Sequence, residues 1–81
     1  MDINTIKERI KWFICTCLGF DKDLLNYDTF LDEGEMILDS IDAIDLISFI
    51  DSEYGVNMSN VSSNNFKNID AIASYIIKNI E

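Results

Sequence analysis

The sequence predicts an all-α fold: a small bundle of three longer helices plus one short helix, with a long loop between helices one and two. Three segments carry apolar residues at spacings of three and four, which is the period of one helix face. Each segment begins beside a residue suited to an N-cap, and glycine follows the first two. No segment shows the sustained alternation of a half-buried strand, so a sheet has no support.

The strongest helical pattern lies in residues 38–54. At about 100° per residue, one face of this helix collects Ala43, Ile44, Leu46, Ile47, Ile50 and Tyr54. Ser40 is suited to the N-cap because its side-chain oxygen can accept a bond from an unpaired amide one turn later. Gly55 stands where a left-handed residue usually ends a helix. Ile41 and Phe49 lie off the apolar face, and we expect them to point toward solvent or toward a docked partner.

The first helix is predicted over residues 4–18, with Asn4 or Thr5 as its cap and Gly19 at its end. Its inner face is expected to hold Ile3, Ile6, Ile10, Phe13, Ile14 and Cys17. Trp12 lies off this face, so it is either partly exposed or covered by the following loop; we favour the second, because large aromatic side chains are highly buried on average.

Cys15 and Cys17 are two residues apart on the predicted first helix, so their side chains diverge and should not form a disulfide with each other. We expect Cys17 to be a small core residue and Cys15 to be a surface thiol. The chain has no histidine and no other cysteine, so a zinc site would lack ligands.

The connection from residue 20 to residue 39 is acidic but contains scattered apolar residues. These apolar residues predict a loop pinned onto the helices, with a short helical turn near residues 22–25. After Gly55, residues 56–58 are expected to be extended and residues 62–66 to form a short helix. Asn68 then caps a last helix, whose inner face is expected to hold Ile69, Ile72, Ala73, Ile76, Ile77 and Ile80.

The charge is strongly negative: fifteen acidic residues oppose six basic ones, for a net charge of −9. Ten of the acids and no base lie between Asp23 and Phe66. Such a field repels phosphate backbones, which argues against nucleic-acid binding, and it favours partners with basic patches. No apolar run reaches the roughly 20 residues that span a bilayer, and the N-terminus lacks the pattern of a secretory signal. We therefore expect a soluble, cytoplasmic monomer without stable membrane insertion.

Catalytic and metal-binding patterns are absent from the sequence. There is no histidine, no glycine-rich phosphate loop and no serine beside an evident base. An EF-hand loop starting at Asp21 fails, because its sixth position is Asn26 instead of glycine and its twelfth is Asp32 instead of glutamate. The protein is therefore expected to be acted upon by enzymes, not to be an enzyme itself.

One stretch resembles a known family. The order Asp39-Ser40-Ile41-Asp42-Ala43-Ile44-Asp45-Leu46-Ile47, followed by an acidic turn and Tyr54-Gly55-Val56, is similar to the Asp-Ser-Leu motif and second helix of acyl carrier proteins. The long first loop and residues 68–76 are also similar to that family. The resemblance covers most of the chain and implies a single carrier domain over residues 1–81 with an acyl-carrier-protein-like fold.

In that family a separate phosphopantetheinyl transferase attaches a 4'-phosphopantetheine arm, taken from coenzyme A, to the motif serine. The resemblance implies that Ser40 is the attachment site and that Asp39 helps the transferase to recognise it. The thiol of the arm would hold acyl or aminoacyl groups as thioesters, which is how cofactors and proteins usually divide such work. Enzymes of fatty-acid, lipid or secondary-metabolite synthesis would load and process these groups.

The resemblance also implies an acidic docking face with apolar contacts, which partner enzymes would meet with arginine and lysine. Its expected residues are Ile41, Asp42, Asp45, Phe49, Asp51 and Glu53.

Two alternatives stay open at this point. The chain is either a carrier or an unmodified acidic helical domain that binds a basic partner through the same helix. As a carrier, it is an acyl, a peptidyl or a D-alanyl carrier.

One departure from the family concerns the approach to the site. Many members have a glycine three or four residues before the serine, whereas Gly34 lies six residues before Ser40. We therefore expect a local difference there.

Overall fold

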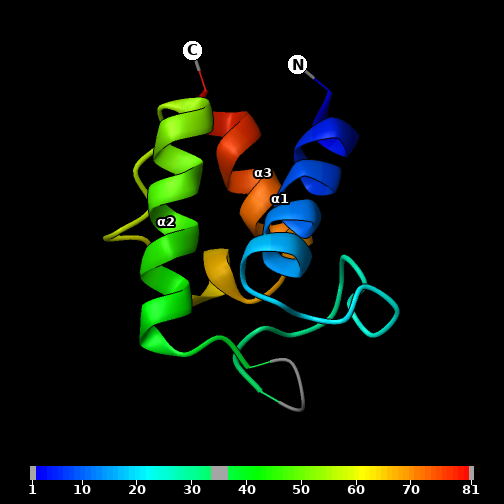
Figure 1. Ribbon diagram of the computed structural model, residues 1–81. Coiled ribbons are helices and arrows are strands. Elements are labelled where there is room, and N and C mark those ends of the chain that lie inside the picture. The colour runs from blue at the N-terminus through cyan, green and yellow to red at the C-terminus, as the bar shows by residue number, and fades with distance from the viewer. Residues whose placement is uncertain (1, 34–36, 81) are drawn as a thin grey trace.

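The computed structural model describes residues 2–33 and 37–80, and Figure 1 shows their path. The elements follow the order α1 (Ile3–Cys17), α2 (Ser40–Tyr54), the 3₁₀ helix η1 (Ser63–Phe66) and α3 (Ile69–Asn79). Residues 2–33 and 37–80 contain no strand. The predicted all-α fold of three longer helices plus one short helix is therefore confirmed, as is the long loop between the first two helices.

Helix α1 begins one residue earlier than the sequence indicated. Its N-cap is Asp2, whose Oδ1 accepts a hydrogen bond from the Asn4 amide at 3.2 Å. The prediction of Asn4 or Thr5 as the cap is wrong, because Asp2 already accepts the hydrogen bond of the Asn4 amide. The helix ends where expected, since Gly19 adopts φ 81° just beyond it.

Two side chains of α1 differ from their predicted environments. Cys17 is exposed, whereas Cys15 is half-buried against the core, so the predicted roles of the two cysteines are reversed. Trp12 is 44% exposed, so it is only partly covered, and the expectation that the following loop would bury it is wrong. The fully buried residues of α1 are Ile6, Ile10 and Ile14. Cys17 points in the same direction, but it is the last residue of the helix and lies beyond the part that these residues bury.

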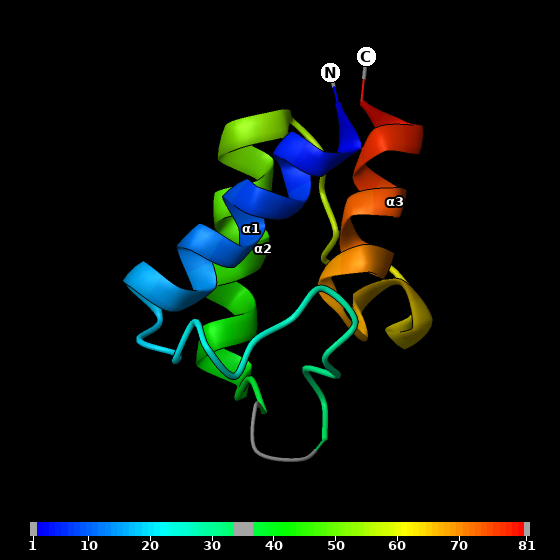
Figure 2. The same ribbon diagram turned by 90° about the vertical axis from the view of Figure 1, so that its right-hand side faces the viewer.

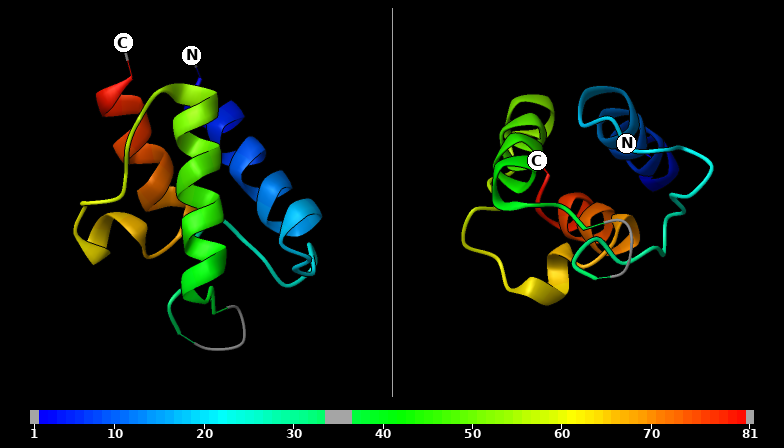
Figure 3. Two further views of the ribbon diagram at one scale, coloured as in Figure 1. Left: turned by 60° about the vertical axis from the view of Figure 1, so that its left-hand side comes forward. Right: turned by 60° about the horizontal axis from the view of Figure 1, so that its bottom comes forward.

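The three long helices surround one aliphatic core, and Figure 3 shows α2 in front of α1 and α3. The side chains that are at most 4% exposed are Ile6, Ile10, Ile14, Leu25, Leu31, Leu46, Ile50, Val56, Met58, Ile69, Ile72, Ala73 and Ile76. At roughly 1.5–3 kcal/mol for each large buried side chain, this cluster is the main source of stability.

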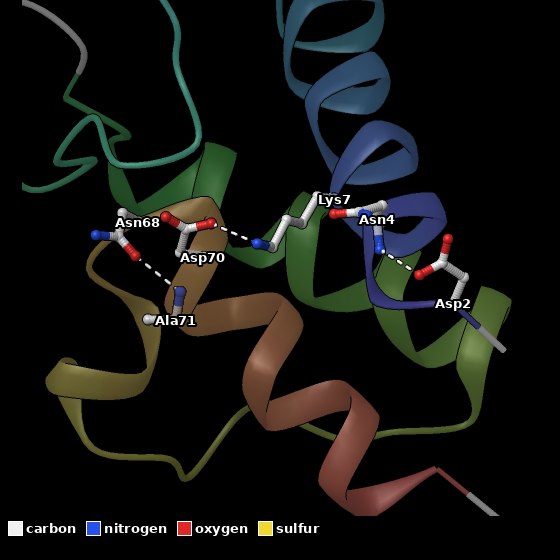
Figure 4. Close-up of polar contacts among 6 residues, drawn as sticks. All are labelled: Asp2, Asn4, Lys7, Asn68, Asp70 and Ala71. Atoms are coloured by element: carbon white, nitrogen blue, oxygen red, sulfur yellow. Dashed lines mark hydrogen bonds and ion pairs between the residues drawn. The ribbon is translucent and has the colours of Figure 1, made fainter.

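Helix α3 begins as predicted, because Asn68 Oδ1 accepts a hydrogen bond from the Ala71 amide at 2.7 Å. An ion pair joins α1 to the first turn of α3, with Lys7 Nζ 2.9 Å from Asp70 Oδ1 (Figure 4). Before α3, the segment after Gly55 runs without regular structure and buries Val56 and Met58. The short helix expected at residues 62–66 is present as η1.

The loop between α1 and α2 runs beneath the bundle (Figure 2), and it is anchored there by some of its apolar side chains, whereas Leu24 and Phe30 are exposed. Leu25 and Leu31 are 0% and 2% exposed. Residues 22–24 form a turn and not the predicted helical turn. Two backbone hydrogen bonds tie the loop to the start of α3, from the Asp70 amide to the Tyr27 carbonyl at 3.0 Å and from the Leu31 amide to the Lys67 carbonyl at 2.7 Å. The prediction of a pinned loop is confirmed.

None of the helices in the described parts of the chain has both the length and the apolar character that a bilayer crossing requires.

Candidate functional site

Ser40 is the first residue of α2 and is exposed to solvent. The residue that caps the helix is Asp39, whose Oδ1 accepts a hydrogen bond from the Asp42 amide at 2.8 Å. The prediction of Ser40 as the N-cap is wrong, because the neighbouring carboxylate occupies that position with extended backbone dihedrals. The consequence is chemical: the Ser40 hydroxyl is not needed to cap the helix.

The mouth of α2 still offers unpaired amides. The first four N–H groups of an α-helix have no acceptor within the helix. Asp39 satisfies the amide of Asp42, and the helix geometry leaves those of Ser40 and Ile41 without an intrahelical acceptor. The positive end of the helix dipole adds to their field, so this position favours an anionic group on or beside Ser40.

The chain enters this site along a fixed path. The Leu38 amide donates a hydrogen bond to the Leu31 carbonyl at 2.9 Å, and Leu31 is itself bonded to the carbonyl of Lys67. Leu38 also packs against the core. These contacts hold the backbone two residues before Ser40 against the junction of η1 and α3. Gly34, on which the predicted local difference depends, lies outside the described residues together with residues 35 and 36.

The outward face of the first half of α2 is apolar beside Ser40. Ile41 is 68% exposed, as predicted, and Ile44 is 62% exposed. The prediction that Ile44 belongs to the core face is wrong. Asp45 is also exposed and lies one turn from Ile41. Ile37, just before the helix, is exposed as well. Three exposed isoleucines, Ile37, Ile41 and Ile44, therefore lie within four residues of Ser40 in the sequence, together with the exposed Asp45 one turn beyond Ile41.

The other predicted docking residues fall into two groups. Asp51 is exposed and Asp42 is half-buried near the start of the helix. Phe49 and Glu53 face α1: the Phe49 ring stacks on Phe13 with centroids 4.3 Å apart, and Glu53 Oε1 lies 2.7 Å from the Arg9 guanidinium. Phe49 is thus packed against the core and does not point toward solvent.

The arrangement can present Ser40 but shows no means of activating it. The chain has no histidine. Between residues 2 and 33 and between residues 37 and 80, the Ser40 hydroxyl makes no hydrogen bond, and no cluster of acidic or cysteine side chains suits a metal ion.

Two pKa values near α1 and α2 are shifted. Burial raises the pKa of the Tyr54 phenol, and the negative charge of Glu53 raises it further. Burial likewise raises the pKa of the Cys15 thiol, although Lys11 opposes that change. Both side chains are therefore neutral at pH 7 and pack as uncharged groups.

Sequence reasoning missed Ile44 and Ile37 as exposed residues of the site. The helical period places Ile44 beside Leu46 and Ile47, so the pattern alone gives no signal against its burial. Ile37 stands in an apolar run, residues 36–38, that reads equally well as a loop anchor. The exposure of both depends on where α1 and the loop contact α2.

The chain was compared with known proteins. No protein-family model matches it. It is 36% identical over 72 residues to the acyl carrier protein of Onion yellows phytoplasma (strain OY-M), covering 89% of this chain and 93% of that relative. It is 36% identical over 74 residues to the acyl carrier protein of Aster yellows witches'-broom phytoplasma (strain AYWB), covering 91% and 96%. The acyl carrier protein of Phytoplasma mali (strain AT) is 32% identical over 76 residues, with 94% and 89% covered.

Proposed function

The chain belongs to the acyl carrier protein family, and from this premise we propose that it carries acyl groups as thioesters on a 4'-phosphopantetheine arm joined to Ser40. The observation that supports this site is the exposed hydroxyl of Ser40 at the first position of α2, released from capping by Asp39. A phosphodiester at Ser40 would meet the unpaired amides and the positive dipole end of the helix. When bound, the arm supplies the thiol that forms the thioester.

The protein's own residues would present and identify the serine. Asp39 fixes the first turn of α2 through its bond to the Asp42 amide, and the same carboxylate is the residue proposed to be recognised by a phosphopantetheinyl transferase. The hydrogen bond between Leu38 and Leu31 holds the preceding backbone in place. The transferase would remove the hydroxyl proton, since this chain offers no base there.

Partner enzymes would dock on the outward face of α2. Ile41 and Ile44 supply apolar contact, and Asp45, Asp51 and Asp42 supply negative charge for basic patches. Glu53 is partly neutralised by Arg9, and Phe49 supports the helix from the side of α1, so both would contribute less than the sequence suggested. Long-range attraction between opposite charges speeds encounter without requiring tight binding, which suits a carrier that must leave each enzyme.

The modification can be tested with a purified phosphopantetheinyl transferase and coenzyme A. Intact-mass measurement should show one added arm on the full chain. Ser40→Ala should show none, because no other group occupies the proposed position. Ser48→Ala is a matched control that removes another exposed serine of α2, and it should be modified like the original chain. An unchanged mass of the original chain, or modification of Ser40→Ala, would contradict the proposal and favour an unmodified interaction domain.

Recognition of Asp39 can be separated from its structural role. Asn is as good an N-cap as Asp, so Asp39→Asn should preserve the start of α2 while removing the charge. We expect the transferase to modify Asp39→Asn more slowly than the original chain at equal folded fraction. Equal rates would mean that Asp39 acts only as a cap.

A further inference from the structure

A hollow lies on the outer side of α1, where the first part of the loop passes the helix. Its volume is about 360 Å³, and it is lined by Glu8, Lys11, Trp12, Cys15, Lys22 and Tyr27, among others. All of these residues belong to α1 or to the loop. The hollow is therefore separate from Ser40 and from the outward face of α2.

The walls of the hollow are apolar and fixed. The Arg9 guanidinium lies 4.4 Å from the centre of the Trp12 ring, and Lys7 Nζ lies 5.7 Å from the centre of the Tyr27 ring. Arg9 and Lys7 are in turn held by their ion pairs with α2 and α3. Each ring thus has a cation beside it within the range of cation–π attraction, which favours this position of the ring. The neutral Cys15 thiol adds a further apolar contact.

The polar side of the hollow is basic in an otherwise acidic protein. Lys11 and Lys22 both line it, against a single lining carboxylate from Glu8. Neither lysine forms an ion pair within residues 2–33 and 37–80. Asp21 is adjacent to Lys22 and accepts a hydrogen bond from the Asp23 amide at 2.9 Å. Its charge also acts on Cys15, so two carboxylates, those of Glu8 and Asp21, lie near the two lysines. Two ammonium groups are therefore available beside two aromatic rings.

We propose that this hollow binds a small amphipathic anion, with its apolar ring or chain on Trp12 and Tyr27 and its carboxylate between Lys11 and Lys22. The volume falls within the range of roughly 300–1,000 Å³ that is usual for small-molecule sites, and a few convergent polar groups in an apolar hollow are typical of them. The proposal does not depend on modification of Ser40.

The probe for this site is 4-phenylbutyrate, titrated into the full unmodified chain at low ionic strength. Trp12 is the chain's single tryptophan, so its emission reports directly on the hollow. We expect a saturable change in emission with one site per chain. The neutral analogue 4-phenyl-1-butanol should bind about tenfold more weakly, because it cannot form charge-assisted hydrogen bonds with the lysines.

Two matched double variants separate local from overall charge. Lys11→Gln with Lys22→Gln should weaken 4-phenylbutyrate binding about tenfold. Lys67→Gln with Lys78→Gln removes the same charge elsewhere and should leave binding within about twofold. Circular dichroism shows that each variant is folded. Absence of saturation, equal weakening by both pairs, or equal binding of the alcohol would overturn the proposal.

Discussion

The two halves of α2 are held very differently. In the second half, Ile50 is fully buried, Phe49 stacks on Phe13, and Glu53 pairs with Arg9. In the first half, Leu46 is fully buried on the inner side, but Ile41 and Ile44 are 68% and 62% exposed on the outward side and Ser40 is open to solvent. The second half of α2 therefore packs against α1, and we call it the clasped half. The first half is free on its outward side.

This difference shows how a small domain can present a serine precisely without burying it. The clasped half fixes the direction of the helix axis. The hydrogen bonds from Leu38 to Leu31 and from Leu31 to Lys67 fix the point where the chain enters the helix. Ser40 needs no contacts of its own, so its surroundings stay open to other proteins.

The largest expected effect is the difference in stability between two variants, each of which shortens one isoleucine, one in each half of α2. Ile50→Ala should lower the free energy of unfolding by about 3 kcal/mol, since it leaves a cavity in the core. Ile44→Ala should change it by less than about 0.5 kcal/mol, because the side chain is already exposed. Urea unfolding followed by circular dichroism measures both. Similar losses for the two variants would show that the first half is as firmly packed as the second.

The sequence predicted the fold because its helices carry clear start and end signals. Gly55, with φ 69°, ends α2, and Asn68 caps α3, both as expected. The long loop was expected to be pinned because apolar residues in a polar connection are stabilised when they are buried against the core. Leu25 and Leu31 are indeed buried. These are local signals, and local signals can be found in a single sequence.

Most of the errors about burial share one physical cause. The helical period shows which residues lie on the same side of a helix, but it does not show which other element packs against that side. Ile44 lies at one edge of the predicted apolar face of α2, and Phe49 lies beyond the opposite edge. Helix α1 packs on the Phe49 edge, so Phe49 becomes half-buried and Ile44 remains exposed. The exchange between Cys15 and Cys17 on α1 has the same origin. The choice between Asp39 and Ser40 as the cap was different, since both residue types are strong caps and only the backbone dihedrals decide.

A smaller effect is expected from the cap at the free end. Asp39→Ala leaves the Asp42 amide without its acceptor and should lower the free energy of unfolding by about 1 kcal/mol. Asp39→Asn should cost much less, because the amide oxygen can accept the same bond. Urea unfolding compares the two variants. If Asp39→Ala is as stable as Asp39→Asn, the cap contributes little and the clasped half alone maintains α2.

The smallest effect concerns pH and belongs to the clasped half, where Tyr54 is half-buried beside Glu53. Burial, and then the charge of Glu53, raises the pKa of this phenol in the folded protein above its ordinary value of 10.0. In the folded state Tyr54 therefore keeps its proton at pH values where the unfolded chain has lost it. Its contribution to stability is complete below about pH 10 and is lost as the pH rises from there through the folded pKa.

Tyr54→Phe has no proton to lose, so its urea midpoint should fall less between about pH 9 and 11 than that of the original chain. Other groups titrate in the same interval, but they are common to both proteins and cancel in the difference. Parallel midpoints across that interval would show that the environment of Tyr54 does not distinguish its two protonation states.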